Sequence, residues 1–375
     1  MTADARIDGA LCALLRGGDV DWPSIGATPD VFVEACGRED VEALVDDRLR
    51  ALPRHAGWPR EVLATLGARA RAAAARELTR QRELARVLEA LAAAGVQPVL
   101  IKGTALAYTV YGAPAWRPRH DTDLFVRRED LPAVRRAMGA LGYTAPPYCD
   151  GDLLFHQFAL TKVDALGTEH VFDVHWKIST QAVFADILSY ADLAADAVAA
   201  PALGPHARAA GALHALLIAC IHPVMHHRNA ERLLWRHDIH LLASGLSSGE
   251  LVQFAGLAEE KGIGPICARA LTGSQEAFGT PVPGHVLSRL GATGNEALLA
   301  YLNPGRRWHH ELLSSLRALR WRGRLRLMRE VLLPAPRYML GAYGITSRAH
   351  GFALLPALYL HRNVCGIWKI LAGRK

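Results

Sequence analysis

The chain has 375 residues, of which 51% are hydrophobic and 21% charged, so it can bury a sizeable core. Its formal net charge of +7 suits an anionic partner, either a nucleotide, a nucleic acid or a membrane surface, and an ordinary basic solvent face is the alternative. Six scattered cysteines argue against a disulfide framework or a zinc knuckle and fit a reducing cytoplasm. No apolar run reaches the ~18–20 residues of a spanning helix, and the N-terminus does not resemble a signal peptide.

Residues 1 to about 90 are predicted to be helical. The stretch from Glu61 to Ala94 is rich in Ala, Leu, Arg and Glu, which favour helix. Leu84, Leu88 and Leu91 keep the spacing of one buried helix face. Gly95 follows them and is typical of the glycine that ends a helix.

A small α/β core is predicted next, and helices are predicted from Gln181 onward, with breaks at Pro and Gly clusters. The two runs Leu153 to Leu160 and His170 to Ile178 flank a turn segment, which predicts a hairpin. Asp130 is placed to cap a helix that Gly142 closes. The other predicted core elements are a strand over 98–101, a helix over 105–111 and a strand over 121–126.

Asp121-x-Asp123 is the main chemical signal in this core. Side chains alternate faces along a strand, so these two carboxylates point to the same side. Magnesium binds well to a few carboxylates together with phosphate oxygens of a substrate. Asp-x-Asp pairs are also common on surfaces and at helix caps, so the pair needs further residues to support a metal site.

Residues 171–178 supply a third carboxylate. Phe172, Val174, Trp176 and Ile178 fall on one face and are expected in the core, which places Asp173 on the opposite face. Three carboxylates can hold two magnesium ions ~3.5–4 Å apart, the arrangement of two-metal nucleotidyl transfer.

The other two polar residues of that opposite face are His175 and Lys177. His175 is expected to orient Asp173 or to touch substrate, and a partly exposed strand histidine is the alternative. Lys177 is interpreted as a solvated residue at the strand end.

Lys102-Gly103-Thr104 lies between a predicted strand and a predicted helix. The glycine permits close approach of a phosphate, the helix N-terminus favours an anion, and Lys102 adds a positive charge. The sequence is not a Walker loop, because the earlier glycine of that motif is absent. Arg117 and Arg119, just before Asp121, are candidates to neutralise phosphate charge.

Several of these segments together resemble the uncharacterised nucleotidyltransferase family of bacteria, part of the superfamily that contains DNA polymerase beta and the aminoglycoside nucleotidyltransferases. The resemblance is dense over about 80–180 and thinner beyond, through 232–239 and 359–362. The segments that carry it are Leu100 to Leu106, Tyr111-Gly112, Arg117-x-x-x-Asp121-x-Asp123-Leu124 and Phe172 to Trp176.

The resemblance implies an α+β fold with a small mixed sheet: an N-terminal helical region at 1–90, the nucleotidyltransferase core at 91–180 and a C-terminal helical region at 181–375. It also implies a nucleoside triphosphate substrate, ATP being one candidate, and release of pyrophosphate. By position, Asp121 and Asp123 would bind both magnesium ions, and Asp173 would bind the catalytic ion and help to activate the acceptor. Gly103 and Thr104 replace the usual Gly-Ser pair of the superfamily, and Arg117 is favoured over Arg119 by the family pattern.

The C-terminal half offers four weaker signals. His222 and His226 share a helix face, but Pro223 lies between them and no zincin glutamate is present, so core or pocket-lining histidines are favoured. Asp238 is expected to cap a helix or to pair with Arg232 or Arg236, and closure over the active site is the alternative. The segment from Leu312 to Arg329 is interpreted as an ordinary helix with a basic solvent face, and binding to anionic lipid or nucleic acid is the alternative. Residues 352–370 are interpreted as a packed helix.

The leading prediction is a cytoplasmic enzyme that transfers a nucleoside monophosphate to an unidentified acceptor. The acceptor could be a small molecule, a glycan intermediate, a peptide or an RNA. One alternative is a non-catalytic nucleotide-binding or scaffold protein of the same fold. Another is a membrane-peripheral partner in envelope or natural-product biosynthesis, suggested by the basic C-terminal half.

Overall fold

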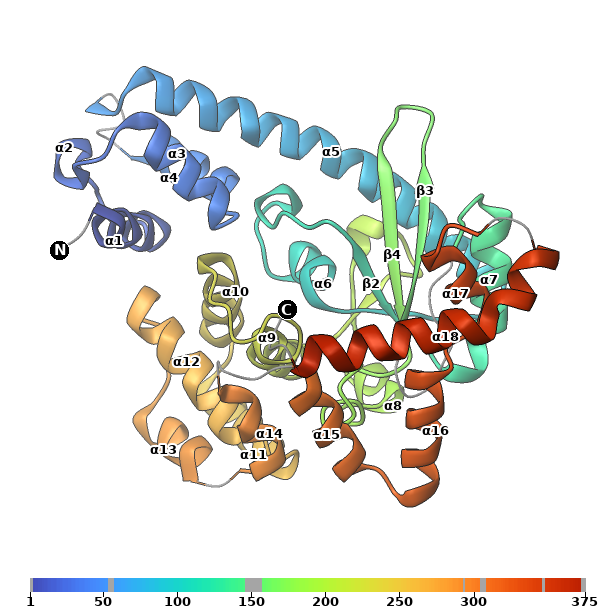
Figure 1. The fold of residues 1–375 in the computed structure, drawn as a ribbon. Coiled ribbons are helices and arrows are strands. Elements are labelled where there is room, and N and C mark those ends of the chain that lie inside the picture. The colour runs from blue at the N-terminus through green and yellow to red at the C-terminus, as the bar shows by residue number, and fades with distance from the viewer. Residues whose placement is uncertain are drawn as a thin grey trace.

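The computed structural model describes residues 3–52, 57–145, 157–292, 294–303, 308–345 and 348–371. The described residues of its N-terminal part form helices joined by short connections, as predicted. A long helix runs over the top of the molecule in Figure 1 and links the small N-terminal helices to the sheet. The helices of this part are α1 (Ala3–Leu15), α2 (Trp22–Ile25), α3 (Pro29–Arg38), α4 (Glu42–Ala51) and α5 (Arg60–Ala93).

The C-terminal half of α5 covers one face of the sheet. Leu84, Leu88 and Leu91 are each at most 1% exposed and pack with Leu124 and Val174 of the strands, as their spacing predicted. The helix ends at Ala93, and Gly95 then takes a φ of +77°, a conformation that glycine adopts without strain.

A six-stranded mixed sheet forms the centre of the fold. Its strands lie in the order β3-β4-β2-β1-β6-β5. β2 pairs parallel with β4 and antiparallel with β1, which in turn pairs parallel with β6. The predicted α+β class is therefore confirmed. The strands are β1 (Val99–Leu100), β2 (Thr122–Phe125), β3 (Gln157–Val163), β4 (Glu169–His175), β5 (Val198–Ala199) and β6 (Arg208–Ala209).

Two differences from the sequence prediction concern strands. The predicted hairpin is present as β3 and β4, although residues 153–156 of its first predicted run lie outside the described residues. The prediction of helices alone from Gln181 onward is wrong for β5 and β6, which add two strands to the sheet. Two-residue strands carry too little periodicity to be recognised, and pairing with β1 and β5 defines β6.

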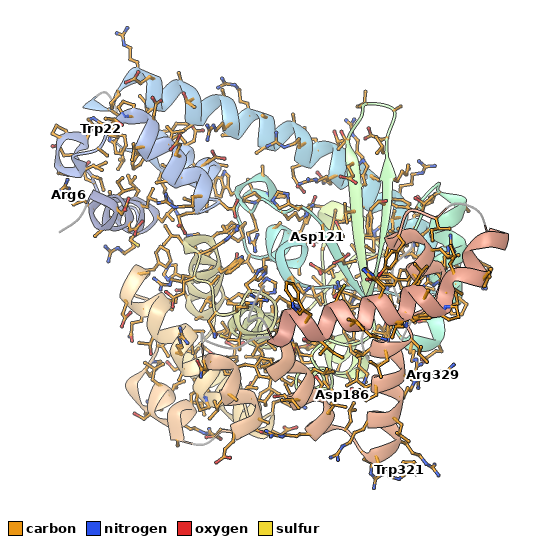
Figure 2. The ribbon with its side chains drawn as sticks, in the orientation of Figure 1. Arg6, Trp22, Asp121, Asp186, Trp321 and Arg329 are labelled. Carbon is orange, nitrogen blue, oxygen red and sulfur yellow. The ribbon has the colours of Figure 1, made fainter. Side chains whose placement is uncertain are left out.

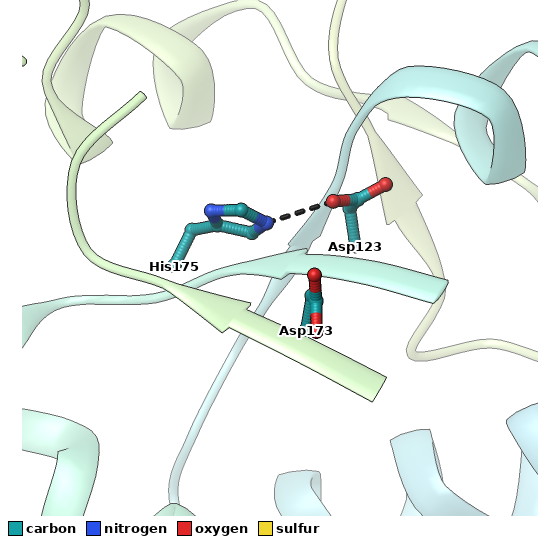
Figure 3. A group of neighbouring side chains, drawn as sticks. All are labelled: Asp123, Asp173 and His175. Atoms are coloured by element: carbon teal, nitrogen blue, oxygen red, sulfur yellow. Dashed lines mark hydrogen bonds and ion pairs between the residues drawn. The ribbon is translucent and has the colours of Figure 1, made fainter. Parts of the chain in front are cut away.

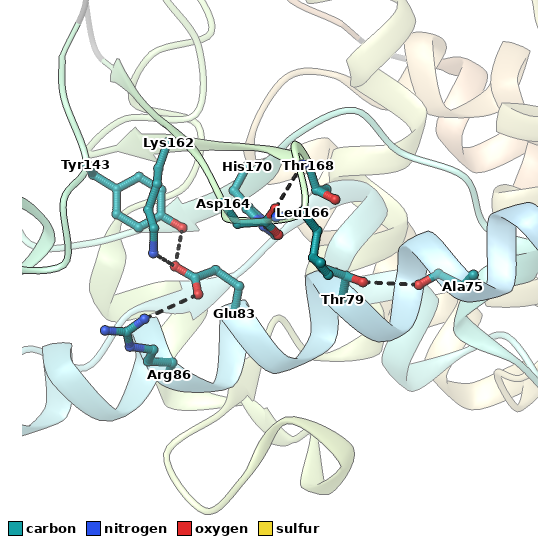
Figure 4. A network of polar contacts seen from close by, with 10 residues as sticks. All are labelled: Ala75, Thr79, Glu83, Arg86, Tyr143, Lys162, Asp164, Leu166, Thr168 and His170. Atoms are coloured by element: carbon teal, nitrogen blue, oxygen red, sulfur yellow. Dashed lines mark hydrogen bonds and ion pairs between the residues drawn. The ribbon is translucent and has the colours of Figure 1, made fainter.

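Polar contacts fasten the β3–β4 hairpin to α5 (Figure 4). Glu83 of α5 accepts hydrogen bonds from Lys162 Nζ at 2.5 Å and from Tyr143 Oη at 3.0 Å. In the hairpin turn, Asp164 Oδ2 lies 3.0 Å from His170 Nε2. The hairpin is thus held on one side by a hydrophobic face and is joined to α5 by the Lys162–Glu83 ion pair, while the Asp164–His170 contact lies within the hairpin.

Helices surround the sheet and make up the C-terminal part. α6 contacts both β2 and α9, so the core and the C-terminal helices meet at this helix. No described helix combines the length and the hydropathy needed to cross a membrane. The remaining α-helices are α6 (Lys102–Thr109), α7 (Leu131–Ala140), α8 (Tyr190–Ala195), α9 (Ala212–His226), α10 (Leu233–Ser244), α11 (Ser248–Glu260), α12 (Gly264–Phe278), α13 (Gly284–Ala292), α14 (Glu296–Leu299), α15 (Trp308–Ala318), α16 (Trp321–Leu332), α17 (Pro336–Ala342) and α18 (Arg348–Leu371).

Candidate metal and nucleotide site

The pairing of β2 with β4 brings two predicted ligands face to face. Asp123 stands directly opposite Asp173 in the parallel register, and Phe125 stands opposite His175. Neighbouring strands lie ~4.8 Å apart and paired residues point to the same face. Ligand atoms of Asp123, Asp173 and His175 consequently lie within 4.8 Å of one another (Figure 3).

Asp121 lies at the margin of this group. It precedes the first residue of β2, and its backbone carbonyl accepts a 3.5 Å hydrogen bond from Thr104 Oγ1. Burial, and then the charge of Asp123, raises the pKa of the Asp121 carboxyl. Its charge in turn contributes to the raised pKa of Asp173, so the three carboxylates act on one another electrostatically.

Asp123 is held in its charged form. Its Oδ1 lies 2.7 Å from Lys102 Nζ and 2.7 Å from His175 Nε2. Burial alone would raise the pKa of this carboxyl, but the charge of Lys102 and the hydrogen bond with His175 lower it well below its usual value. The carboxylate therefore stays ionised over the whole physiological range.

Asp173 has the opposite environment. Burial, and then the charges of Asp123 and Asp121, raise its pKa to about 6. Gln157 Nε2 donates a 3.1 Å hydrogen bond to its Oδ2. Crowding of like charges of this kind is relieved by a divalent cation, which favours the ionised form of every carboxylate that binds it.

His175 is completely buried, so the alternative of a partly exposed strand histidine is wrong. It contacts Asp123 and not Asp173, the residue it was expected to orient. Burial, and then the charge of Lys102, lowers the pKa of its imidazole, which is therefore neutral and donates from Nε2 to Asp123. Its other nitrogen, Nδ1, is buried without a hydrogen-bond partner in the described structure.

Lys102, Gly103 and Thr104 form the first turn of α6, so the predicted helix begins three residues earlier than expected. The first amides of a helix have no partner inside it and attract an anion. Lys102 takes a φ of +54°, unusual for a residue with a side chain, and its ammonium group reaches Asp123. The amides of this turn and the lysine charge lie next to the carboxylates, as phosphate binding beside a metal requires.

Arg117 lies in a buried ion pair with Asp238 of α10. Arg117 Nε is 2.7 Å from Asp238 Oδ1 and Nη2 is 2.8 Å from Oδ2. The prediction that Asp238 pairs with Arg232 or Arg236 is wrong, because Arg232 pairs with Asp40 and Arg236 pairs with Glu231. The guanidinium also packs behind Gly103, where an added Cβ would lie 3.3 Å from Nη1.

Arg119, the second candidate, is also engaged by a carboxylate: Nη1 and Nη2 lie 2.7 Å and 2.8 Å from the two oxygens of Glu77. The sequence did not single out Arg80 of α5, whose pKa responds to the charge of Asp121 and whose side chain donates to the backbone carbonyl of Arg119. The sequence could not identify Arg80 as a site residue, because α5 contains many arginines and the position of Arg80 does not distinguish it from the others.

Two histidines of α9 also face this site. Burial, and then the charge of Lys102, lowers the pKa of His226 to about 3, and His175 and Asp123 act on it as well. His226 Nε2 and His222 Nδ1 are buried without hydrogen-bond partners in the described part of the chain. The burial of these nitrogens agrees with the core or pocket-lining role favoured for these histidines, and the His222 ring lies 5.5 Å from the Trp235 ring.

The donor set fits a divalent cation. Carboxylate oxygens suit magnesium and manganese, and His175 orients one of these carboxylates through its hydrogen bond to Asp123. The close approach of Asp123 and Asp173, beside the first turn of α6, supplies the negative charge that such an ion requires.

Comparison with known proteins agrees with this geometry. The model of a family described as uncharacterised nucleotidyltransferase matches residues 26–279, about two thirds of the chain. The match includes the sheet, the carboxylates and helices α9 and α10. No curated protein and no solved structure matches significantly. The chain therefore belongs to the uncharacterised nucleotidyltransferase family.

Proposed function

We propose that this protein transfers a nucleoside monophosphate from a nucleoside triphosphate to an acceptor and releases pyrophosphate. The observation that carries the proposal is the facing pair Asp123 and Asp173 on adjacent parallel strands, beside the N-terminal turn of α6. The family to which the chain belongs is consistent with this chemistry. The division into helical regions at 1–90 and 181–375 around a core at 91–180 remains part of the proposal.

Asp121, Asp123 and Asp173 are the proposed ligands of two magnesium ions, and His175 holds Asp123 in place. Magnesium ions bound there would neutralise charge on the phosphoryl oxygens of the transition state. Asp173 accepts the proton of the attacking hydroxyl group. Its oxygens are accessible for this role because only Gln157 is seen to hydrogen-bond them among the described residues.

The triphosphate is assigned to the first turn of α6. Lys102, Gly103 and Thr104 offer backbone amides, a lysine ammonium and a hydroxyl group in one place. Arg117 supports this turn from behind Gly103, and its charge lies close to the phosphates although Asp238 neutralises part of it. Lys102 is proposed to exchange Asp123 for a phosphate oxygen when the substrate binds.

The alternative is a non-catalytic protein of the same fold. A site that has lost its activity commonly lacks one carboxylate or has it turned away, whereas Asp123 and Asp173 converge here with His175. This favours an active enzyme. The acceptor, a small molecule, glycan intermediate, peptide or RNA, would enter beside His222 and His226 of α9. A cytoplasmic location is part of the proposal, since nucleoside triphosphates are available there.

Nucleotide binding tests the proposal without knowledge of the acceptor. Calorimetric titration of the purified chain with ATP, CTP, GTP and UTP in the presence of Mg²⁺ should show binding of at least one triphosphate. The variant Asp123→Asn/Asp173→Asn should lose the metal-dependent part of this binding. Asp186→Asn is the matched control, because this carboxyl is 79% exposed and lies away from the site. Binding that is equal in all three proteins, or absent from the wild type, contradicts the proposal.

Turnover is measured as pyrophosphate release. Each triphosphate that binds is incubated with pooled metabolites and with RNA, and the double variant serves as the blank. Release by the wild type above this blank supports transfer. Binding without release above the blank over all pools favours the non-catalytic alternative.

A further inference from the structure

The C-terminal part of the chain differs in charge from the rest. Residues 304–375 contain 14 arginines and lysines and 2 glutamates, a net charge of +12, so residues 1–303 carry −5. No Asp or Glu follows Glu330. The family match ends at residue 279, so this basic part lies outside the region that carries the nucleotidyltransferase signature.

Helix α16 presents an apolar stripe to solvent. Its buried side, with Leu327 and Val331, packs against the protein. Trp321 and Leu325, on another side, are 64% and 63% exposed, and Leu332 continues this stripe at helical spacing. The basic solvent face predicted for this segment is present on α16, and the exposed apolar stripe is a feature that the prediction did not include.

Arginines line the exposed stripe of α16. Arg322 and Arg329 are exposed and follow Trp321 and Leu325 around the helix, and the Arg322 guanidinium lies 5.2 Å from the Trp321 ring. Figure 2 shows Trp321 and Arg329 on the outside of the molecule, away from the sheet. A tryptophan and leucines bordered by arginines are the composition of helices that lie in the interface of an anionic bilayer.

Helix α18 also presents a stripe of apolar side chains to solvent. One side is fixed to the end of α16, through Arg362 Nη1 to the Val331 carbonyl at 2.7 Å and through Tyr359 Oη to the Pro334 carbonyl. Leu360, Val364 and Ile367, on the opposite side, are 67%, 56% and 57% exposed. The predicted packed helix is thus packed on one side only.

We propose that these exposed side chains of α16 and α18 form a docking surface for an anionic phospholipid bilayer. The apolar residues enter the interface and the arginines bind lipid phosphates. A second copy of the chain is a poor occupant, because two surfaces of the same positive charge repel each other. A nucleic acid would satisfy the arginines but leave the leucines in water. The inference does not depend on the proposed nucleotidyl transfer.

Vesicle co-sedimentation of the full chain tests the proposal. Vesicles of phosphatidylcholine with phosphatidylglycerol should pellet the protein, and vesicles of phosphatidylcholine alone should pellet far less. High salt should release the protein, because exposed charges are screened. Equal pelleting with both lipids, or none with either, overturns the proposal.

Two variants separate the charged and apolar contributions. Arg322→Gln/Arg329→Gln should lower the partition coefficient about fivefold for each arginine removed. Trp321→Ser/Leu325→Ser should lower it at least about tenfold, since both side chains lose their burial in the interface. The folded state should be unaffected by both changes, as thermal unfolding would verify.

Leu78→Ser/Leu166→Ser is the matched control. These leucines are 58% and 83% exposed, on α5 and in the hairpin turn, so the variant removes apolar surface elsewhere. Its vesicle binding should equal that of the wild type. If all variants pellet like the wild type, the surface is not the lipid contact. If the Trp321 variant instead abolishes self-association in a vesicle-free ultracentrifuge run, a second copy is the occupant and the proposal fails.

Discussion

The ion pair between Arg117 and Asp238 joins the nucleotidyltransferase core to α10, and its removal should cost far more stability than an ordinary salt bridge. The two side chains are 10% and 4% exposed, and Tyr111 Oη donates a further 2.7 Å hydrogen bond to Asp238 Oδ1. Asp238→Ala leaves a guanidinium and a phenol buried without their acceptor. We expect a loss of about 4 kcal/mol in the free energy of unfolding, the usual cost of breaking a buried pair.

Urea denaturation followed by far-UV circular dichroism measures this loss. Asp186→Ala removes an exposed partner of Lys177 and should cost less than about 1 kcal/mol, which makes it the matched control. The double variant Arg117→Leu/Asp238→Leu should lose less stability than Asp238→Ala, because no unpaired charge remains.

The reasoning is refuted if Asp238→Ala costs no more than Asp186→Ala. That result would mean that Arg117 finds water or another acceptor on losing Asp238. It would also make Arg117 available to substrate phosphates and would strengthen its assignment as a direct triphosphate ligand.

Two further predictions concern stability. Burial raises the pKa of Glu83, but the hydrogen bonds from Lys162 and Tyr143 and the charge of Lys162 together outweigh burial and hold the pKa below the usual value. Glu83→Gln should therefore lower the free energy of unfolding by about 2 kcal/mol at neutral pH. Urea titrations at several pH values should show this loss shrinking as the pH falls through the lowered pKa of Glu83. A loss that is independent of pH would exclude this explanation. Gly211→Ala should destabilise by more than about 2 kcal/mol, because its Cβ would lie 2.6 Å from the carbonyl oxygen of Asp196. Gly139→Ala, with nothing within 4 Å, should be neutral or stabilising, and equal melting temperatures for the two glycine variants would contradict the packing argument.

Local patterns in the sequence determined the elements and the faces of the core. Alternation placed Phe172 and Val174 on the buried side and Asp173 on the other, and helical spacing placed Leu84 and Leu88 against the sheet. These patterns are readable because the periods of a strand and a helix are fixed by backbone geometry over a few residues. The same local logic failed for β5 and β6, which are too short to show a period.

Only the tertiary structure decided which side chains meet. The register of β2 on β4 sets Asp123 opposite Asp173, and brings His175 to Asp123 instead of the expected Asp173. Arg117 and Asp238 are 121 positions apart, and no short-range rule selects that pairing. Partner choice of this kind depends on the free energy of the whole packed chain, where a buried charge must find a counter-charge, whereas the sequence alone specifies only which residues could serve.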